Sequence, residues 1–331
     1  MFFFEQKYLC KIMIENGLKT KKSRYDFTIT STLTFLLLLC QYTNAQLLEV
    51  NQPLFSDEPF FNSHFIKVNK IKSITGSRSS KKIQDIIRSK GLDFYYEFDE
   101  NGYLSKQIAT FLVGGVNKDT NIMCYEYNNN GHLILKRKSD NYGFYSYHYQ
   151  LDTLNRIVKQ TYNREENTYA CKGNFKLCHQ YKISSDSFSY QKLDATQIKK
   201  LFYNNYGKVF KHQTNYYDEF GYLIEEYTKF IIGNKKSRKK YYYDENGRLI
   251  KQDHLSYLTK GKMVTTTYEY DDIGNILFVK IYHNTQHITT KQFLYDKKTM
   301  LLTAQLIQDI ASEFIEIIQY QYTFFSDINN Y

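Results

Sequence analysis

Apolar and polar positions alternate along most of the chain, and short turn-forming stretches interrupt the alternation at recurring intervals. The clearest unit is residues 241–249, with the sequence YYYDENGRL. Its tyrosines at positions 241 and 243 share one face of a strand, because side chains alternate with a period of two. The polar residues that follow are typical of a tight turn, and the apolar positions then resume. The unit therefore predicts a β-hairpin.

The same unit recurs along the chain with Asp or Asn at its first turn position and, with one exception, Gly three residues later. The pairs are Asp99 and Gly102, Asn128 and Gly131, Asp152 and Asn155, Asn204 and Gly207, Asp218 and Gly221, Asp244 and Gly247, and Asp271 and Gly274. A divergent copy has Asp296 and, at the glycine position, Thr299, so its turn is expected to differ. Most copies lie about 25 residues apart. The wide interval between Asn155 and Gly207 predicts a worn copy around Tyr181–Ser187.

Turn chemistry explains both conserved positions of the unit. The first side chain accepts hydrogen bonds from the amides ahead of it, and Gly adopts positive φ without steric strain. A type I turn followed by such a residue gives a short hairpin loop with a bulge. This role is sufficient to explain the repeated aspartates, although a pair of them could also serve as glycosidase carboxylates.

Hairpins of this kind are marginal alone and must stack on their neighbours. The sequence predicts an all-β fold in which tandem antiparallel hairpins form a long twisted meander sheet or a partial shell. The repeats occupy residues 93–326, and the tail from 301 to 325 is expected to add two strands rather than a helix. Residues 46–92 lack the unit and are interpreted as an N-terminal capping segment, with a short helix over Ser79–Gly91.

The unit resembles the YD repeats of the Rhs family, and residues 243–249 (YDENGRL) are its closest match. The resemblance covers residues 93–300. It implies a β-hairpin repeat fold similar to the small stand-alone YD-repeat proteins of bacterial envelopes, and it implies no defined activity. A remnant or accessory of an Rhs-like toxin-delivery system is a further hypothesis that rests on this resemblance alone.

The N-terminus carries an export signal. A basic stretch precedes an apolar run of about a dozen residues that ends in Leu36–Leu39, and small residues follow. We interpret residues 1–45 as a signal peptide that is cleaved after Ala45, with Met13 as an alternative start. The protein is therefore expected in the periplasm, at the outer membrane surface or outside the cell. Cys40 allows a lipoprotein, but the bulky Leu39 before it disfavours that reading.

Composition supports strands, because the chain has 33 Tyr and 24 Phe but only 2 Pro. Cys171 and Cys178 flank a predicted hairpin loop and could form a disulfide in an exported protein, or remain thiols. His179 beside Cys178 does not supply enough ligands for zinc. His283 and His287 likewise lack a nearby third ligand. No nucleophile elbow, phosphate loop or dinucleotide fingerprint occurs, so we expect no catalytic residue, metal or cofactor.

The formal net charge is +10, and one basic run stands out. Its members are Lys235, Lys236, Arg238, Lys239 and Lys240. The run could bind an anionic envelope surface, or it could be a solvated loop or a guard for a strand edge. Nucleic acid is not expected as a partner. The main functional hypothesis is an exported binding or structural scaffold. The alternative is a carbohydrate-binding or carbohydrate-active protein that uses its tyrosine-rich face.

Overall fold

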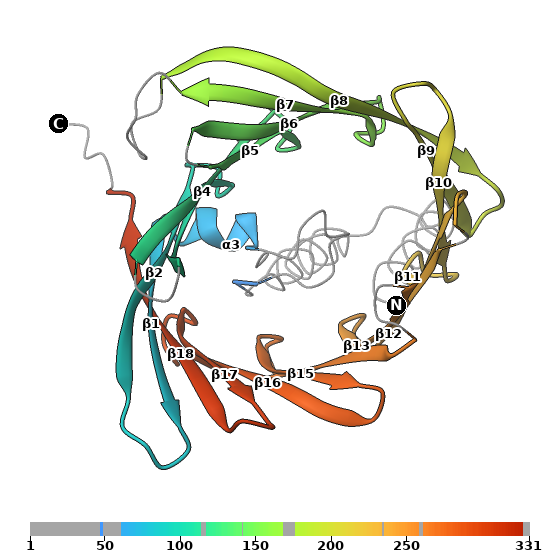
Figure 1. Ribbon diagram of the computed structural model, residues 1–331. Coiled ribbons are helices and arrows are strands. Elements are labelled where there is room, and N and C mark those ends of the chain that lie inside the picture. Colours follow the sequence, from blue (N-terminus) through green and yellow to red (C-terminus); the bar gives the residue numbers. More distant parts are fainter. Residues whose placement is uncertain are drawn as a thin grey trace, which may run out of the picture.

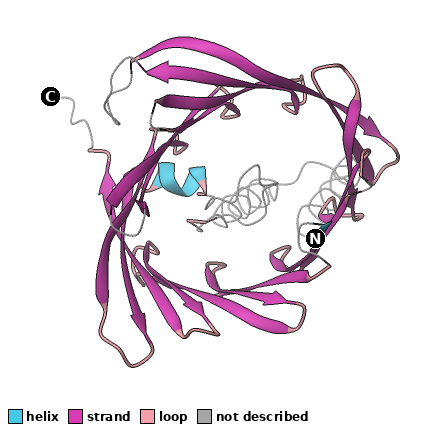
Figure 2. Cartoon of the chain, viewed as in Figure 1, coloured by secondary structure: helices cyan, strands magenta, loops and turns pink. Residues whose placement is uncertain are grey.

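The computed structural model describes residues 47–48, 61–113, 117–140, 142–167, 176–233, 235–257 and 261–326. Figures 1 and 2 show a ring of strands with one short helix, α3 (Ser63–Val68), inside it. The predicted signal peptide, Met13, Cys40 and Cys171 lie outside the described residues. No helix among the described residues is long and apolar enough to cross a membrane.

Eighteen antiparallel strands are formed by the described residues. They are β1 (Ile71–Lys82), β2 (Arg88–Phe98), β3 (Leu104–Val113), β4 (Asn117–Tyr127), β5 (Leu133–Ser139), β6 (Gly143–Leu151), β7 (Ile157–Asn167), β8 (Leu177–Lys192), β9 (Gln197–Tyr203), β10 (Val209–Tyr217), β11 (Leu223–Phe230), β12 (Lys236–Tyr243), β13 (Leu249–Ser256), β14 (Met263–Tyr270), β15 (Ile276–His283), β16 (Gln286–Tyr295), β17 (Leu302–Asp309) and β18 (Phe314–Phe324).

The sheet is a closed barrel, so the prediction of a long meander sheet or partial shell is wrong. Each strand pairs with its neighbours in sequence, and β1 pairs with both β2 and β18. Ile74, for example, lies opposite Tyr96 on one side and Tyr322 on the other. The closing strand comes from the segment interpreted as a cap. Closure satisfies the backbone groups that an open sheet would leave at its two edges.

The N-terminal segment also differs from its predicted local structure. Ser79 belongs to β1 and Gly91 to β2, so no helix forms between them. The helix lies earlier, in α3, where the Asn62 side chain accepts a hydrogen bond of 3.1 Å from the Phe65 amide. Residues 79–91, which were predicted to form a helix, instead contribute to β1 and β2, at the point where the barrel closes. The tail folds as the two predicted strands, β17 and β18.

The repeated turns share one hydrogen-bond pattern. In the turn at Asp244, the carboxylate accepts bonds of 2.9 Å from the amides of Asn246 and Arg248, and the Gly247 amide donates to the Asp244 carbonyl at 3.0 Å. The same side-chain bonds recur at the first turn position of the other units, at Asp99, Asn128, Asp152, Asn204, Asp218 and Asp271. A register shift beside each turn marks the bulge that accompanies this loop.

Two divergent units depart from the pattern in ways that the sequence indicated only in part. In the Asp296 turn, positive φ moves one residue on, to Met300, and Thr299 bonds back to the aspartate. The worn copy does not turn at Tyr181–Ser187, which lies inside the long strand β8. The chain turns after β8, where Asp194 accepts a bond from the Thr196 amide. The wide interval between units thus contains the long strand β8 and a turn that lacks the Asp-x-x-Gly pattern.

Tyrosine hydroxyls link successive units. In five places, a tyrosine hydroxyl donates a hydrogen bond to the carbonyl that begins the return strand of an earlier hairpin, and in three of these the tyrosine directly precedes the turn of a unit. The pairs are Tyr127 to Leu104, Tyr190 to Ile157, Tyr243 to Leu223, Tyr270 to Leu249 and Tyr322 to Leu302, at 2.6–3.0 Å. Each of these carbonyls lies beside a bulge, where the ladder is locally interrupted. The bond gives Tyr127, Tyr243 and Tyr270 a role that Phe could not fill.

The hydrophobic core lies inside the barrel, where α3 packs against one part of the wall. Phe65 and Ile66 of α3 are buried together with wall residues of β1, β2 and β15 to β17. The strand residues in this core are Ile71, Ile74, Tyr96, Phe98, Ile276, Val279, Phe293 and Leu302. Phe61, which precedes the helix, makes edge contacts with the rings of Tyr96 and Phe98 at centroid distances of 5.0 Å.

Candidate functional site: the inner wall and the end of the β7–β8 hairpin

The core identifies which side chains point inward. Val279 packs in the core, and its cross-strand partner Tyr268 therefore faces inward as well. Cross-strand partners share a face and side chains alternate along each strand, so the register extends this assignment around the wall. On β8 to β11 the inner wall carries four aromatic rings and two lysines. These are Phe188, Tyr190, Lys200, Phe202, Lys211 and Phe230.

The two lysines lie against the rings. The Lys200 Nζ is 4.3 Å from the Phe188 ring centroid, 5.0 Å from that of Phe202 and 5.4 Å from that of Tyr190. The Lys211 Nζ is 3.7 Å from the Phe202 centroid and 5.7 Å from that of Phe230. Cation–π contacts of this kind contribute about 0.5–2 kcal/mol each, more where water is excluded. We call these six residues the lysine–aromatic wall.

Neither lysine of this wall is paired with a carboxylate among the described residues. Burial lowers the pKa of Lys200 to about 8, and the neighbouring charge of Lys211 lowers it further. Burial also lowers the pKa of Lys211, which the charges of Glu226 and Asp186 partly offset, and Glu226 acts on Lys200 in the same direction. No ion pair joins either lysine to an acidic group in the described part of the chain. Two partly desolvated cations without a directly paired carboxylate form a site that attracts an anion.

Tyrosines elsewhere on the inner wall stay neutral. Burial raises the pKa of Tyr268 to about 12. Burial, together with the neighbouring Tyr147, also raises the pKa of Tyr149 to about 12. Tyr145 and Tyr147 each stack with Tyr162 across the β6–β7 pair at centroid distances of 5.6 and 4.8 Å. This part of the inner wall therefore offers rings and hydroxyl donors.

The basic run does not form a single patch. Alternation along β12 sends Arg238 and Lys240 to the outer face and Lys239 to the inner face. Arg238 pairs with Glu225 at 2.9 Å, and Lys239 approaches Glu226 at 4.0 Å. Neighbouring strand β11 thus neutralises part of the run. Binding of this run to an anionic envelope surface stays a prediction.

The outer face contains a polar groove of about 400 Å³ between β7, β8 and the turn at Asn204. Its lining offers two amines, several hydroxyls and two amides. The polar lining residues are Lys159, Lys182, Ser184, Ser185, Ser187, Asn204 and Asn205. The Ser185 amide donates to Asn205 Oδ1 at 2.6 Å, which fixes one wall of the groove.

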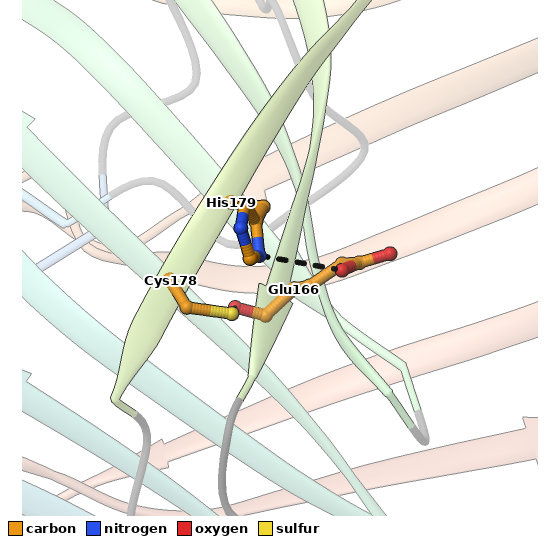
Figure 3. A group of neighbouring side chains, drawn as sticks. All are labelled: Glu166, Cys178 and His179. Atoms are coloured by element: carbon orange, nitrogen blue, oxygen red, sulfur yellow. Dashed lines mark hydrogen bonds and ion pairs between the residues drawn. The ribbon is translucent and has the colours of Figure 1, made fainter.

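Three metal-binding side chain types meet at the end of the β7–β8 hairpin (Figure 3). Glu166 comes from β7, and Cys178 and His179 come from β8. Their ligand atoms all lie within 4.8 Å of one another. Spacing along the sequence could not reveal this group, because Glu166 reaches it only through strand pairing. A disulfide between Cys171 and Cys178 stays a prediction, since Cys171 lies outside the described residues.

The other predicted residues do not converge. Each turn aspartate bonds to the amides of its own turn, which leaves the carboxylates distributed among separate hairpins. His287 stacks on Tyr282 at 4.8 Å and bonds to Thr290 rather than meeting His283. The lysine–aromatic wall was missed, although the alternation of Lys200 and Phe202 on one face is visible in the sequence.

Comparisons with known proteins assign no family. No protein-family model matches the chain, and no curated protein matches it at a significant level. Among solved structures, a porin-like protein from Bacteroides uniformis is 12% identical with a TM-score of 0.37, and the alignment covers 77% of this chain and 97% of that one. A porin-like protein from Bacteroides vulgatus is 10% identical with a TM-score of 0.29, covering 65% and 97%.

A more distant likeness is to the Photorhabdus luminescens Tc holotoxin pore, which is 11% identical with a TM-score of 0.21. That alignment covers 67% of this chain but 14% of the other. Likenesses at these levels identify no function. The architecture of the chain rests on its own strand pairing, and membership of the Rhs-like repeat family stays a prediction.

Proposed function

We propose that the protein is an exported, non-enzymatic binding barrel whose lysine–aromatic wall holds an anionic ligand carried on an apolar or ring-shaped body. The observation that supports this most strongly is the position of Lys200 and Lys211 against four rings, with no carboxylate paired to either ammonium. An anion would neutralise both charges at once. The rings would contact the body of the ligand, as aromatic side chains do in most small-molecule sites.

The outer wall supports an exported barrel that contacts water. Val279 points inward, so its neighbour Lys280 points outward, where it pairs with Glu269 at 2.6 Å. Arg238 and Glu225 form a similar pair on the same face. A charged side chain facing lipid near the bilayer midplane costs about 2–4 kcal/mol, which disfavours a lipid-embedded position for this sector. Recovery of the mature chain from the soluble fraction without detergent would test this part of the proposal.

Two dyes that differ in charge test the binding site. Anilinonaphthalene sulfonate carries an anion on an aromatic body, and phenylnaphthylamine is its neutral counterpart. We expect the full chain to bind the sulfonate at least about tenfold more tightly, and we expect Lys200→Gln and Lys211→Gln each to remove that preference. Lys208→Gln, which changes an exposed lysine in a turn, is the matched control. Equal binding of the two dyes, or binding of neither, would contradict the proposal.

Carbohydrate binding is a second candidate, supported by the groove at β7 and β8. Its hydroxyl, amide and amine groups match the hydrogen-bonding capacity of a saccharide, and its volume lies in the range of about 300–1,000 Å³ found for ligand pockets. A glycan array with the full chain and with Asn205→Ala would test it. Binding that the substitution abolishes is expected, and an array without any bound glycan would count against this candidate.

A further inference from the structure

The end of the β7–β8 hairpin holds a group of side chains unrelated to the lysine–aromatic wall (Figure 3). A thiol, an imidazole and a carboxylate are gathered there from two strands, with Cys178 and His179 adjacent on β8 and Glu166 opposite on β7. We propose that Glu166, Cys178 and His179 bind a zinc ion and leave one coordination position open to water.

The distances suit zinc after a small adjustment. Zinc takes sulfur at about 2.3 Å and nitrogen or oxygen at about 2.0–2.2 Å, so tetrahedral ligand atoms lie about 3.3–3.8 Å apart. His179 Nδ1 and Glu166 Oε2 are 3.9 Å apart, and all three ligand atoms lie within 4.8 Å. The side chains of His179 and Glu166 are 69% and 47% exposed, so each has room to close the remaining gap by rotation.

Neighbouring groups hold the ligands in place. The Tyr181 hydroxyl donates to Glu166 Oε2 at 3.4 Å, and the Tyr181 ring stacks with that of His179 at a centroid distance of 6.3 Å. One residue therefore orients two of the three ligands, as the outer groups of metal sites commonly do. Cys178 Sγ lies 3.6 Å from the Glu166 carbonyl oxygen, which places the sulfur beside the residue that supplies the carboxylate.

The donor set selects the class of metal. Thiolate and imidazole favour zinc over magnesium or calcium, which prefer oxygen ligands. Binding requires the thiolate and the neutral imidazole, so affinity would fall as pH decreases and both groups take up protons. A disulfide between Cys178 and Cys171 would remove the thiolate, so the metal site and the predicted disulfide exclude each other.

Zinc titration of the reduced full chain tests the proposal. We expect one equivalent to bind, as measured by competition with a chromophoric chelator, and we expect cobalt in the same site to show a thiolate-to-metal absorption band. Cys178→Ser and His179→Gln should each weaken zinc binding at least tenfold (about 1.4 kcal/mol). Tyr181→Phe should weaken it by about tenfold through lost orientation.

Two variants serve as controls. Cys124→Ser changes the other described free thiol, and Cys171→Ser prevents the alternative disulfide; both should leave zinc affinity unchanged. Because the ligands are exposed, thermal unfolding of the metal-free variants should match that of the metal-free parent. Failure of the reduced chain to bind zinc, a cobalt complex without the thiolate band, or full binding by Cys178→Ser would each overturn the proposal.

Discussion

The inner wall of the barrel has two sectors that the same hairpin unit builds in different ways. Around β1, β2 and β15 to β18, inward side chains such as Tyr96 and Val279 pack against α3 and form the buried core. Across β8 to β11, the wall presents Lys200 and Lys211 among aromatic rings. The first sector gains stability from burial of apolar surface, although it also holds Lys291, whose pKa burial lowers, opposite Val279. The second sector places two partly desolvated charges side by side among rings.

This contrast separates stability from binding within one repeated architecture. The turns and the strand alternation are shared by both sectors, so the difference comes from the residues at the inward positions. Changes in the packed sector should therefore reduce the stability of the barrel, and changes in the lysine–aromatic wall should act mainly on binding. The following predictions test that separation, from the largest expected effect to the smallest.

The packed sector should be most sensitive at Ile66. This side chain of α3 is 0% exposed, and Ile66→Ala would remove contacts inside the core. We expect the free energy of unfolding to fall by about 2–5 kcal/mol, as for other buried aliphatic truncations. Val68→Ala on the same helix removes a side chain that is 63% exposed and should change it little. Equal effects, measured by denaturant titration, would show that α3 does not pack against the wall.

Substitution of a turn glycine should have different effects in the two sectors, because the turns have different neighbours. Gly102 and Gly221 both have φ near +85°, so Ala at either position is strained by about 1–2 kcal/mol. A Cβ at Gly102 would also collide with the Ser63 carbonyl of α3, whereas a Cβ at Gly221 meets open space. Gly102→Ala should therefore lower the melting temperature more than Gly221→Ala. Identical melting temperatures would contradict the packing of α3 against the turn at Gly102.

The tyrosine hydroxyls should stabilise the links between hairpins. Tyr270→Phe would leave the Leu249 carbonyl without its 2.6 Å partner, at a cost of about 1–3 kcal/mol. Tyr206→Phe is the control, because Tyr206 is 85% exposed. Chemical denaturation of both variants would decide the matter. A Tyr270→Phe protein as stable as its parent would mean that the bond contributes nothing.

The lysine–aromatic wall should differ from the packed sector in showing a clear dependence of stability on pH. The pKa of Lys200 is about 8 in the folded state and higher in the unfolded chain. Between pH 8 and 10 the unfolded state thus binds more protons, so the Lys200 contribution to stability rises with pH. Below pH 8 the cost of burying the charge is fully present. Lys200→Met should remove this rise and the preference for the sulfonate over the neutral dye.

Unfolding measured at several pH values, with parent and Lys200→Met compared at each, isolates the lysine from other groups. The comparison should stop at about pH 10. There, tyrosines such as Tyr268, whose pKa burial raises to about 12, begin to ionise in the unfolded chain first and lower stability. A constant difference between the two proteins across this range would contradict the lowered pKa of Lys200.

The hairpin unit could be predicted from the sequence, but the closure of the barrel could not. The residues of each turn act over four positions, as the bonds of Asp244 to Asn246 and Arg248 show, so a local pattern is enough to predict them. Closure depends on β1, whose sequence IKSITGSRSSKK has no repeat unit and few large apolar residues. Its pairing with β18 joins residues about 240 positions apart, and no local signal specifies that register.

The candidate sites show the same limit. Lys200 and Phe202 share a face by simple alternation, but their contact with Phe188 and Lys211 depends on two further strands. The group at the β7–β8 hairpin likewise needs the pairing that brings Glu166 to Cys178 and His179. The sequence was enough to predict the residue types and the strands. The pairing of the strands and its register could be seen only in the fold.

The most direct test of the binding claim is to measure the pKa of the Lys200 ammonium in the full chain. Carbon-13 NMR of its ε carbon would monitor the titration with and without anilinonaphthalene sulfonate. An anion held beside Lys200 stabilises the charged form, so the account predicts a pKa of about 8 in the free protein and a clear rise when the sulfonate binds. A pKa that stays the same at saturating dye would show that the anion does not bind at the lysine–aromatic wall.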